Sequence, residues 1–132
     1  MPTHIIGNLW LGNLHDAEKL FGKPSWITLN VLEKDIEETK QDFYIPILYR
    51  DSSGKYHLDW NKVFEASDLI EKILIENPFN NLLVHCGAGQ ERSPLVVQYW
   101  LVRHMGMNPD QAFDMIKKLR PEVIKCDMDY IW

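Results

Sequence analysis

The sequence has few cysteines, no long apolar run and no cluster of positive charge. Its two cysteines, Cys86 and Cys126, lie far apart and outside any CxxC or cysteine–histidine spacing, so neither a disulfide framework nor a zinc site is indicated. No stretch approaches the roughly 18 apolar residues of a membrane-spanning helix. The net charge is −5 and the basic residues are scattered, which argues against a nucleic-acid backbone as the main partner.

The length and the amino terminus lead to further exclusions. A chain of 132 residues without repeats or a Ser/Gly-rich linker is expected to form one domain over residues 1–132. The opening residues MPTHIIGNLW contain neither a basic segment nor an uninterrupted apolar segment, so a secretory signal is not predicted. We therefore expect a cytoplasmic protein that does not associate with membranes.

Short apolar segments alternate with helical patterns along the chain. Strands are predicted at residues 5–11, 26–32, 43–48 and 81–86. Helices are predicted at residues 16–21, 33–41, 60–76, 94–105 and 109–119. Asp59 is suited to cap the third helix, and Asn108 with Gln111 forms a capping-box pattern before the last one. The alternation predicts an α/β fold with a mainly parallel central sheet of four to five strands flanked by helices, and a ligand site at the carboxyl ends of the strands.

The segment HCGAGQERS, residues 85–93, follows the last predicted strand and precedes a helix. Cys86 lies at the strand tip, where we expect its sulfur to be exposed. A free thiol has a pKa of about 8.5, so a nucleophile at neutral pH needs positive potential or hydrogen-bond donors near the sulfur. A glycine-rich turn ahead of a helix supplies inward N–H groups that suit a phosphate. The predicted phosphate-binding residues are Gly87, Ala88, Gly89, Gln90, Glu91 and Arg92.

Two side chains at the end of this segment have chemistry that suits a bound phosphate. Arg92 carries a planar fork of donors that matches two phosphate oxygens, which a lysine cannot offer. Ser93 is placed to donate a hydrogen bond to a thiolate, or to the leaving thiolate when a phospho-cysteine breaks down. Both residues are therefore candidates for catalysis together with Cys86.

His85, Cys86, Gly89, Arg92 and Ser93 fit the pattern HCxxGxxRS. This is the motif of the cysteine-dependent protein tyrosine phosphatase superfamily, and the surrounding sequence is most similar to its compact dual-specificity branch. The resemblance implies a dual-specificity phosphatase-like fold and a phosphatase without metal or cofactor. Its substrates would be phosphorylated proteins, with phosphotyrosine and also phosphoserine and phosphothreonine hydrolysed through a phospho-cysteine on Cys86. His85 would orient the loop by hydrogen bonding and tune the thiol, and a monomer is expected.

The resemblance also implies a general acid. Family members carry an aspartate on a mobile loop upstream of the cysteine, where it protonates the leaving oxygen and later activates water. Asp51 follows a predicted strand and precedes the residues SSG, so it occupies the expected place. A turn-forming role is the alternative for Asp51, and Asp59 is its competitor for the acid role.

Glu91 departs from the small or uncharged residue that many relatives have before the arginine, and a role in holding Arg92 or an adjoining loop is open. The loop also lacks lysines, which disfavours a polyphosphorylated inositol head. Three other functions remain as alternatives: a phosphatase for nucleic-acid 5′ ends or phosphoinositides, a phosphate-reading module with little turnover, and a sulfurtransferase or arsenate-reductase-like redox role. Cys126 is interpreted as a packing residue, with a redox partner of Cys86 as the alternative.

Overall fold

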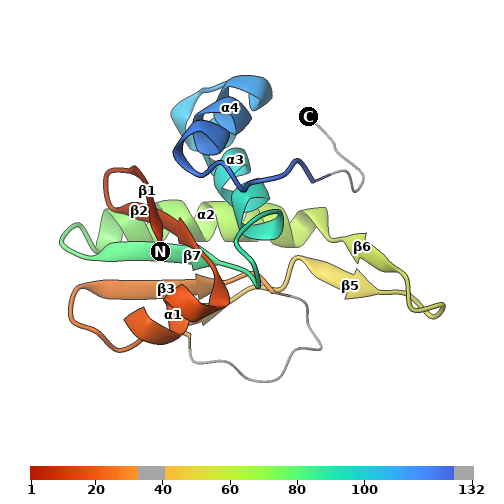
Figure 1. The fold of residues 1–132 in the computed structure, drawn as a ribbon, viewed down its shortest axis with the longest axis horizontal. Coiled ribbons are helices and arrows are strands. Elements are labelled where there is room, and N and C mark those ends of the chain that lie inside the picture. The colour runs from red at the N-terminus through yellow and green to blue at the C-terminus, as the bar shows by residue number, and fades with distance from the viewer. Residues whose placement is uncertain (33–40, 127–132) are drawn as a thin grey trace.

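A computed structural model of the chain describes residues 1–32 and 41–126. A five-stranded sheet in the order β1-β2-β7-β3-β4 forms its centre (Figure 1). The pairing of β1 with β2 is antiparallel, and the other three pairings are parallel. The predicted α/β fold with a mainly parallel central sheet is therefore confirmed. The strands are β1 (Thr3–Ile6), β2 (Leu9–Gly12), β3 (Trp26–Asn30), β4 (Phe43–Tyr44) and β7 (Asn81–His85).

The middle strand of this sheet is β7, which pairs with β2 on one side and β3 on the other. Its residues 82–85 are all buried, as expected for a strand that is covered on both faces. The pairing register sets His85 beside Gly12 of β2 and Asn30 of β3. The chain therefore leaves the middle of the sheet at its carboxyl edge, directly before Cys86.

Two of the predicted strands are corrected by the structure. Residues 5–11 form two antiparallel strands, not one, because the chain reverses at Gly7, which has a φ of +54° and accepts this backbone conformation without a Cβ clash. Residues 43–48 also divide, since Pro46 has no N–H to continue a ladder. The chain beyond Pro46 forms β5 (Leu48–Arg50), which pairs with β6 (Tyr56–Leu58) in a separate hairpin that was not predicted.

The helices are α1 (Leu14–Leu20), α2 (Trp60–Glu76), α3 (Arg92–Met105) and α4 (Pro109–Leu119). The predicted caps are confirmed: the Asp59 carboxylate accepts a hydrogen bond from the Lys62 N–H, and Asn108 and Gln111 form a capping box. Helix α3 begins at Arg92, two residues earlier than predicted, so Arg92 and Ser93 lie in its first turn. Of the helix predicted at residues 33–41, residues 33–40 lie outside the described residues.

The sheet has a large apolar core on the face covered by α2 and α3, and a smaller layer on the face covered by α1. Helices α2 and α3 pack against each other and against β7, while α1 contacts β3 and β7. Because side chains alternate along a strand, Leu82 and Val84 join the large core, and Leu83 and His85 face the side of α1. Figure 1 shows α4 packed beyond α3, and α4 also contacts β1 at the edge of the sheet. In residues 1–32 and 41–126, no helix has the length and apolar character needed to cross a membrane.

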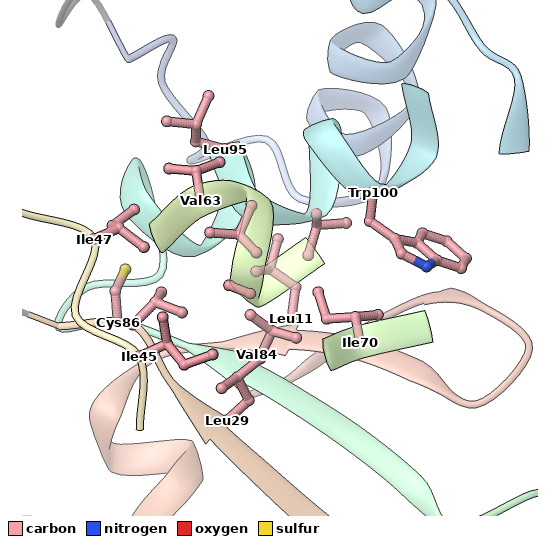
Figure 2. Close-up of a cluster of buried hydrophobic side chains, with 14 of the residues drawn as sticks. Leu11, Leu29, Ile45, Ile47, Val63, Ile70, Val84, Cys86, Leu95 and Trp100 are labelled. Atoms are coloured by element: carbon pink, nitrogen blue, oxygen red, sulfur yellow. The ribbon is translucent and has the colours of Figure 1, made fainter. Parts of the chain in front are cut away.

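Figure 2 shows how the large core reaches the carboxyl edge of the sheet. Leu11, Leu29 and Val84 come from strands, and Val63 and Leu95 come from α2 and α3. Cys86 belongs to the same cluster, and its sulfur lies at the end of the core that also holds Ile45 and Ile47. The core therefore extends to the sulfur of the predicted nucleophile.

Candidate active site

Cys86 is almost completely buried, with 1% of its surface exposed. The expectation of an exposed sulfur at the strand tip is therefore wrong for this arrangement of the chain. The physical reason is that Cys86 joins the apolar cluster of α2, α3 and the segment around Ile45, so these side chains cover the end of β7. The sulfur therefore lies at the bottom of the loop, next to the apolar core.

Ser93 lies directly beside the cysteine. Its Oγ is 3.2 Å from the Cys86 Sγ, and either atom is able to act as the donor. Ser93 has no exposed surface and sits in the first turn of α3, so the helix fixes its position relative to the sulfur. When the sulfur is a thiolate it has only acceptor character, and the Ser93 hydroxyl then donates. The contact also places the N-terminus of α3 next to the sulfur, where the partial positive charge of the helix favours an anion.

The carbonyl groups of the loop after Cys86 are held from outside by three different segments. The Gly87 carbonyl accepts from the Leu14 N–H at 2.9 Å, and the Gln90 carbonyl accepts from the Ile124 N–H at 2.8 Å. The Gly89 carbonyl accepts from the Arg120 Nε at 3.0 Å. In the described part of the chain, no hydrogen bond uses the N–H groups of residues 87–91. The loop therefore keeps a set of free backbone donors, which is what an anion-binding nest requires.

Gly89 is required twice in this loop. Its φ of +69° lies in the left-handed region, which costs other residues roughly 1–2 kcal/mol. A Cβ atom at this position would also lie 2.6 Å from the Gly12 carbonyl oxygen and 2.8 Å from the Arg120 Nη2. The glycine therefore allows the loop to pack directly on the end of β2.

Arg92 and Glu91 complete the loop. A Cβ atom built on Gly87 would lie 3.4 Å from the Arg92 Nη2, so the guanidinium group lies back over the loop that precedes it. Glu91 occupies the N-cap position of α3, but its side chain makes no capping hydrogen bond. The two side chains are half-buried and bring opposite charges to the loop.

His85 lies under the loop with no exposed surface. Its carbonyl accepts from the Val31 N–H at 3.0 Å, whereas neither ring nitrogen has a hydrogen-bond partner among the described residues. Burial lowers the pKa of His85 from its ordinary 6.5 to about 4, because the apolar surroundings disfavour the charged ring. The imidazole is thus neutral at pH 7, and an interaction of the ring with the backbone of Cys86, at the start of the loop, opposes part of this lowering of the pKa.

Asp51 lies in the turn of the β5–β6 hairpin, and all its hydrogen bonds stay within that hairpin. Its Oδ1 accepts from the Ser53 N–H at 2.8 Å, the Ser53 Oγ at 2.5 Å and the Lys55 N–H at 3.1 Å. Its Oδ2 is 2.7 Å from the His57 Nε2. Hydrogen bonds from the Ser53 hydroxyl and from His57 hold the pKa of Asp51 well below its ordinary range.

The structure brings Cys86 and Ser93 together, whereas the described hydrogen bonds of Asp51 and Asp59 go to other residues. No interaction joins Asp51 to residues 86–93 in the described part of the chain, and Figure 1 shows the β5–β6 hairpin extending away from the central sheet. Asp59 caps α2. The turn-forming geometry that was the alternative for Asp51 is therefore present, and its role as general acid stays a prediction.

Other residues near the loop were not singled out from the sequence. Arg120, at the end of α4, is 3% exposed and contacts the loop at Gly89, and no spacing in the sequence indicated this contact. Cys126 is also buried, in the same cluster as Cys86, and the two form no disulfide. Across residues 1–32 and 41–126, no three histidine, cysteine or acidic side chains form a group that could hold a metal ion.

Comparison with known proteins places this loop in a family. Residues 9–131 match the model of the dual specificity phosphatase catalytic domain. The chain therefore belongs to the cysteine-dependent protein tyrosine phosphatase superfamily, in its compact dual-specificity branch. It is also similar in fold to the crystal structure of human DUSP28, with a TM-score of 0.71 and 20% sequence identity over 94% of this chain and 84% of that one.

Two curated relatives differ in the substrate that their names give. The chain is 30% identical over 128 residues to dual specificity protein phosphatase 16 of Homo sapiens, which covers 92% of this chain and 18% of that protein. It is 42% identical over 41 residues to phosphatidylglycerophosphate phosphatase PTPMT1 of Arabidopsis thaliana, which covers 31% of this chain and 12% of that protein. This chain thus spans less than a fifth of the length of either relative. The matches support a cysteine-based phosphatase.

Proposed function

We propose that this chain is a protein phosphatase that hydrolyses phosphotyrosine, and also phosphoserine and phosphothreonine, through a phospho-cysteine on Cys86. The observation that carries the proposal is the loop itself: three of its carbonyls are bound from outside, and its N–H groups lie ahead of the N-terminus of α3. Such a loop is suited to bind a phosphate dianion next to a sulfur.

The reaction divides into two displacements at phosphorus. The Cys86 thiolate attacks the phosphorus atom, a sulfur–phosphorus bond forms, and the bond from phosphorus to the oxygen of the substrate side chain breaks. Arg92 and the loop N–H groups hold the phosphoryl oxygens through both steps. Water then attacks the phospho-cysteine, releases inorganic phosphate and returns the thiolate, which the Ser93 hydroxyl stabilises from 3.2 Å. No electrons are gained or lost, and neither a metal nor a cofactor enters the scheme.

The proton for the leaving oxygen is assigned to Asp51. Asp51 reaches the substrate when the β5–β6 hairpin moves and the hydrogen bond that the His57 Nε2 donates to its Oδ2 is broken. A bound phosphate dianion brings negative charge close to the carboxylate, which raises a carboxyl pKa and favours the protonated form that donates. Asp59 is the second candidate, and its use would require α2 to lose its N-cap.

Several further properties belong to the same proposal. Residues 1–132 form a single catalytic domain that acts as a monomer on phosphorylated proteins in the cytoplasm, without binding nucleic acid or membranes. Two buried cysteines that form no disulfide are compatible with a reducing compartment. A net charge of −5 gives no general attraction to polyanionic surfaces.

A phosphorylated lipid is the second candidate substrate, because one relative is a phosphatidylglycerophosphate phosphatase by name. Between Gly87 and Glu91 the loop carries no basic side chain and one carboxylate. A carboxylate beside the site repels a second phosphate group on the same substrate. This composition is the reason for preferring a protein substrate with one phosphate near the loop.

The test is phosphate release from matched phosphotyrosine and phosphothreonine peptides and from phosphatidylglycerophosphate in mixed micelles, with a metal chelator present. The wild type is compared with Cys86→Ser and with Cys126→Ser, which removes the other buried thiol. Release from peptides that persists in Cys126→Ser and stops in Cys86→Ser supports the proposal. Release from the lipid alone would move the function to the second candidate, and no release from any substrate would overturn both.

A further inference from the structure

Arg120 is a charged side chain inside the protein, at the point where α4 ends. It is 3% exposed, and a buried guanidinium is costly unless its donors are satisfied. Its Nε donates to the Gly89 carbonyl at 3.0 Å. Its Nη1 donates to the Met1 carbonyl at 3.1 Å and to the Thr3 Oγ1 at 2.9 Å, and its Nη2 is 3.8 Å from the Glu122 Oε2. The side chain thus ties the phosphate loop to the start of β1.

We infer that Arg120 is a positioning residue of the phosphate loop, which sets the direction of the peptide group between Gly89 and Gln90. This inference rests on the proposed function of the loop as a phosphate site. The side chain of Arg120 contacts the backbone of the loop from outside, and Arg120 does not itself bind the phosphate. Its effect is therefore on how well the loop is preorganised.

The geometry of the peptide bond explains the effect. A trans peptide is planar, and its carbonyl and its N–H point in opposite directions. When Arg120 holds the Gly89 carbonyl on the outside of the loop, the N–H of Gln90 in the same peptide points to the inside. Glycine adopts a wider range of backbone dihedral angles than other residues. Without an outside donor to the Gly89 carbonyl, this peptide group is therefore able to turn over. A turned peptide would point a carbonyl oxygen at the phosphate and repel it.

The other two fixed carbonyls have different donors. Leu14 and Ile124 hold the Gly87 and Gln90 carbonyls through their own backbone N–H groups, which every substitution except proline retains. The Gly89 carbonyl depends on a side chain. A substitution at Arg120 therefore removes one of the three outside hydrogen bonds to the loop and leaves the loop sequence unchanged.

The experiment measures how tightly the loop holds a tetrahedral oxyanion. Tungstate is titrated against the rate at which iodoacetamide alkylates Cys86 at pH 7, because a bound oxyanion blocks the sulfur. The variants are Arg120→Met, which keeps an unbranched apolar stem, and Arg120→Lys, which keeps the charge but has a different donor geometry. Arg103→Met is the matched control, since Arg103 pairs with Asp68 at the exposed end of α3. Ile116→Ala, in the buried face of α4, controls for destabilisation alone.

The expected result is a tungstate dissociation constant about tenfold higher in Arg120→Met, which corresponds to the loss of one hydrogen bond. The constant in Arg103→Met and in Ile116→Ala stays within about twofold of the wild type. Two milder variants are Arg120→Lys and Thr3→Val, the second of which removes one acceptor of Arg120. Their tungstate dissociation constants are expected to lie between those of the wild type and Arg120→Met, and they replace Arg120→Met in the test if that variant does not fold.

Two results would overturn the inference: unchanged tungstate protection in folded Arg120→Met or in both milder variants, or an equal loss in Ile116→Ala. Failure of the proposed function is distinguished from these, because tungstate protection requires no turnover. A chain that shows the Arg120 effect but releases phosphate from no substrate would overturn the phosphatase proposal and leave the positioning role in place. A wild type without any tungstate protection would overturn both.

Discussion

The Cys86 Sγ and the Ser93 Oγ lie 3.2 Å apart in a region where neither residue has more than 1% of its surface exposed. A hydrogen bond to a charged group contributes about 1.5–3 kcal/mol when it is shielded from water. Negative charge on the sulfur is lost in the first step, when the thiolate attacks, and develops in the second step, when the phospho-cysteine breaks down and the thiolate leaves. The Ser93 hydroxyl therefore acts mainly on the second step of the proposed reaction.

Ser93→Ala is expected to lower kcat by roughly ten- to a hundredfold, since each 1.4 kcal/mol is a factor of ten in rate. The first turnover slows less, so a burst of leaving group appears before the steady state. Rapid-quench kinetics with an aryl phosphate measures both phases. Ser93→Thr keeps the hydroxyl and is the control. Equal slowing of the burst and the steady state would show that Ser93 does not act on the breakdown of the intermediate.

Asp51 and Asp59 give opposite expectations on substitution by asparagine. If Asp51 is the general acid, Asp51→Asn lowers kcat on a phosphopeptide by about 10²–10⁴-fold, which is the usual size of this contribution. Asp59→Asn keeps activity within about twofold, because asparagine is an equally good N-cap residue. The rate on p-nitrophenyl phosphate falls less in Asp51→Asn, since that leaving group needs little protonation. A large loss in Asp59→Asn alone would transfer the acid role to Asp59.

The sequence predicted those elements whose signals are local. The apolar run before Cys86 identified β7, and Asp59 and Asn108 identified the starts of α2 and α4 through their capping chemistry. In the hairpin, Tyr49 pairs with His57 across the turn that holds Asp51. The alternation of YRDSSGKYH around the SSG turn was an available signal for this hairpin, but β6 is short and was not predicted.

The features that sequence reasoning missed depend on contacts between distant segments. The burial of Cys86 follows from packing against residues such as Ile45 and Val63, which come from other elements. The contact between Arg120 and Gly89 joins positions that are 31 residues apart in the sequence. The motif identified the loop residues because their spacing is fixed within the loop, whereas nothing local in the sequence identifies the donors that hold it from outside.

Gly89→Ala is expected to be much more harmful than the same change at another left-handed glycine. The φ values of Gly89 and Gly22 are +69° and +75°, so both substitutions carry the same backbone strain of roughly 1–2 kcal/mol. Only at Gly89 does the new Cβ meet a backbone oxygen, that of Gly12 at 2.6 Å, whereas nothing lies within 4 Å at Gly22. Urea unfolding and tungstate binding of the two variants measure the difference. Equal losses would mean that the loop is able to shift away from β2 without cost.

The buried imidazole of His85 makes the stability of the fold depend on pH. The ordinary histidine pKa is 6.5, and burial lowers the pKa of His85 to about 4 in the folded chain. Between these values the unfolded chain binds a proton at this position and the folded chain does not. Stability therefore falls as the pH is lowered from about 6.5 to about 4. Asp51, whose pKa is also lowered, contributes stability that is lost only at still lower pH, so the two effects separate.

Replacing His85 by glutamine removes the pH-dependent contribution of the imidazole. From pH 7 to pH 4 the free energy of unfolding of the wild type is expected to fall by up to about 3 kcal/mol more than that of His85→Gln, at 1.36 kcal/mol per pKa unit. Urea unfolding at pH 7, 6, 5 and 4 measures the slopes, with His15→Gln as control because His15 is exposed. A His85→Gln slope equal to that of the wild type would show that the acid-sensitive group lies elsewhere. A slope reduced equally in His15→Gln would show that removing any histidine lowers the pH dependence of stability, whether or not the histidine is buried.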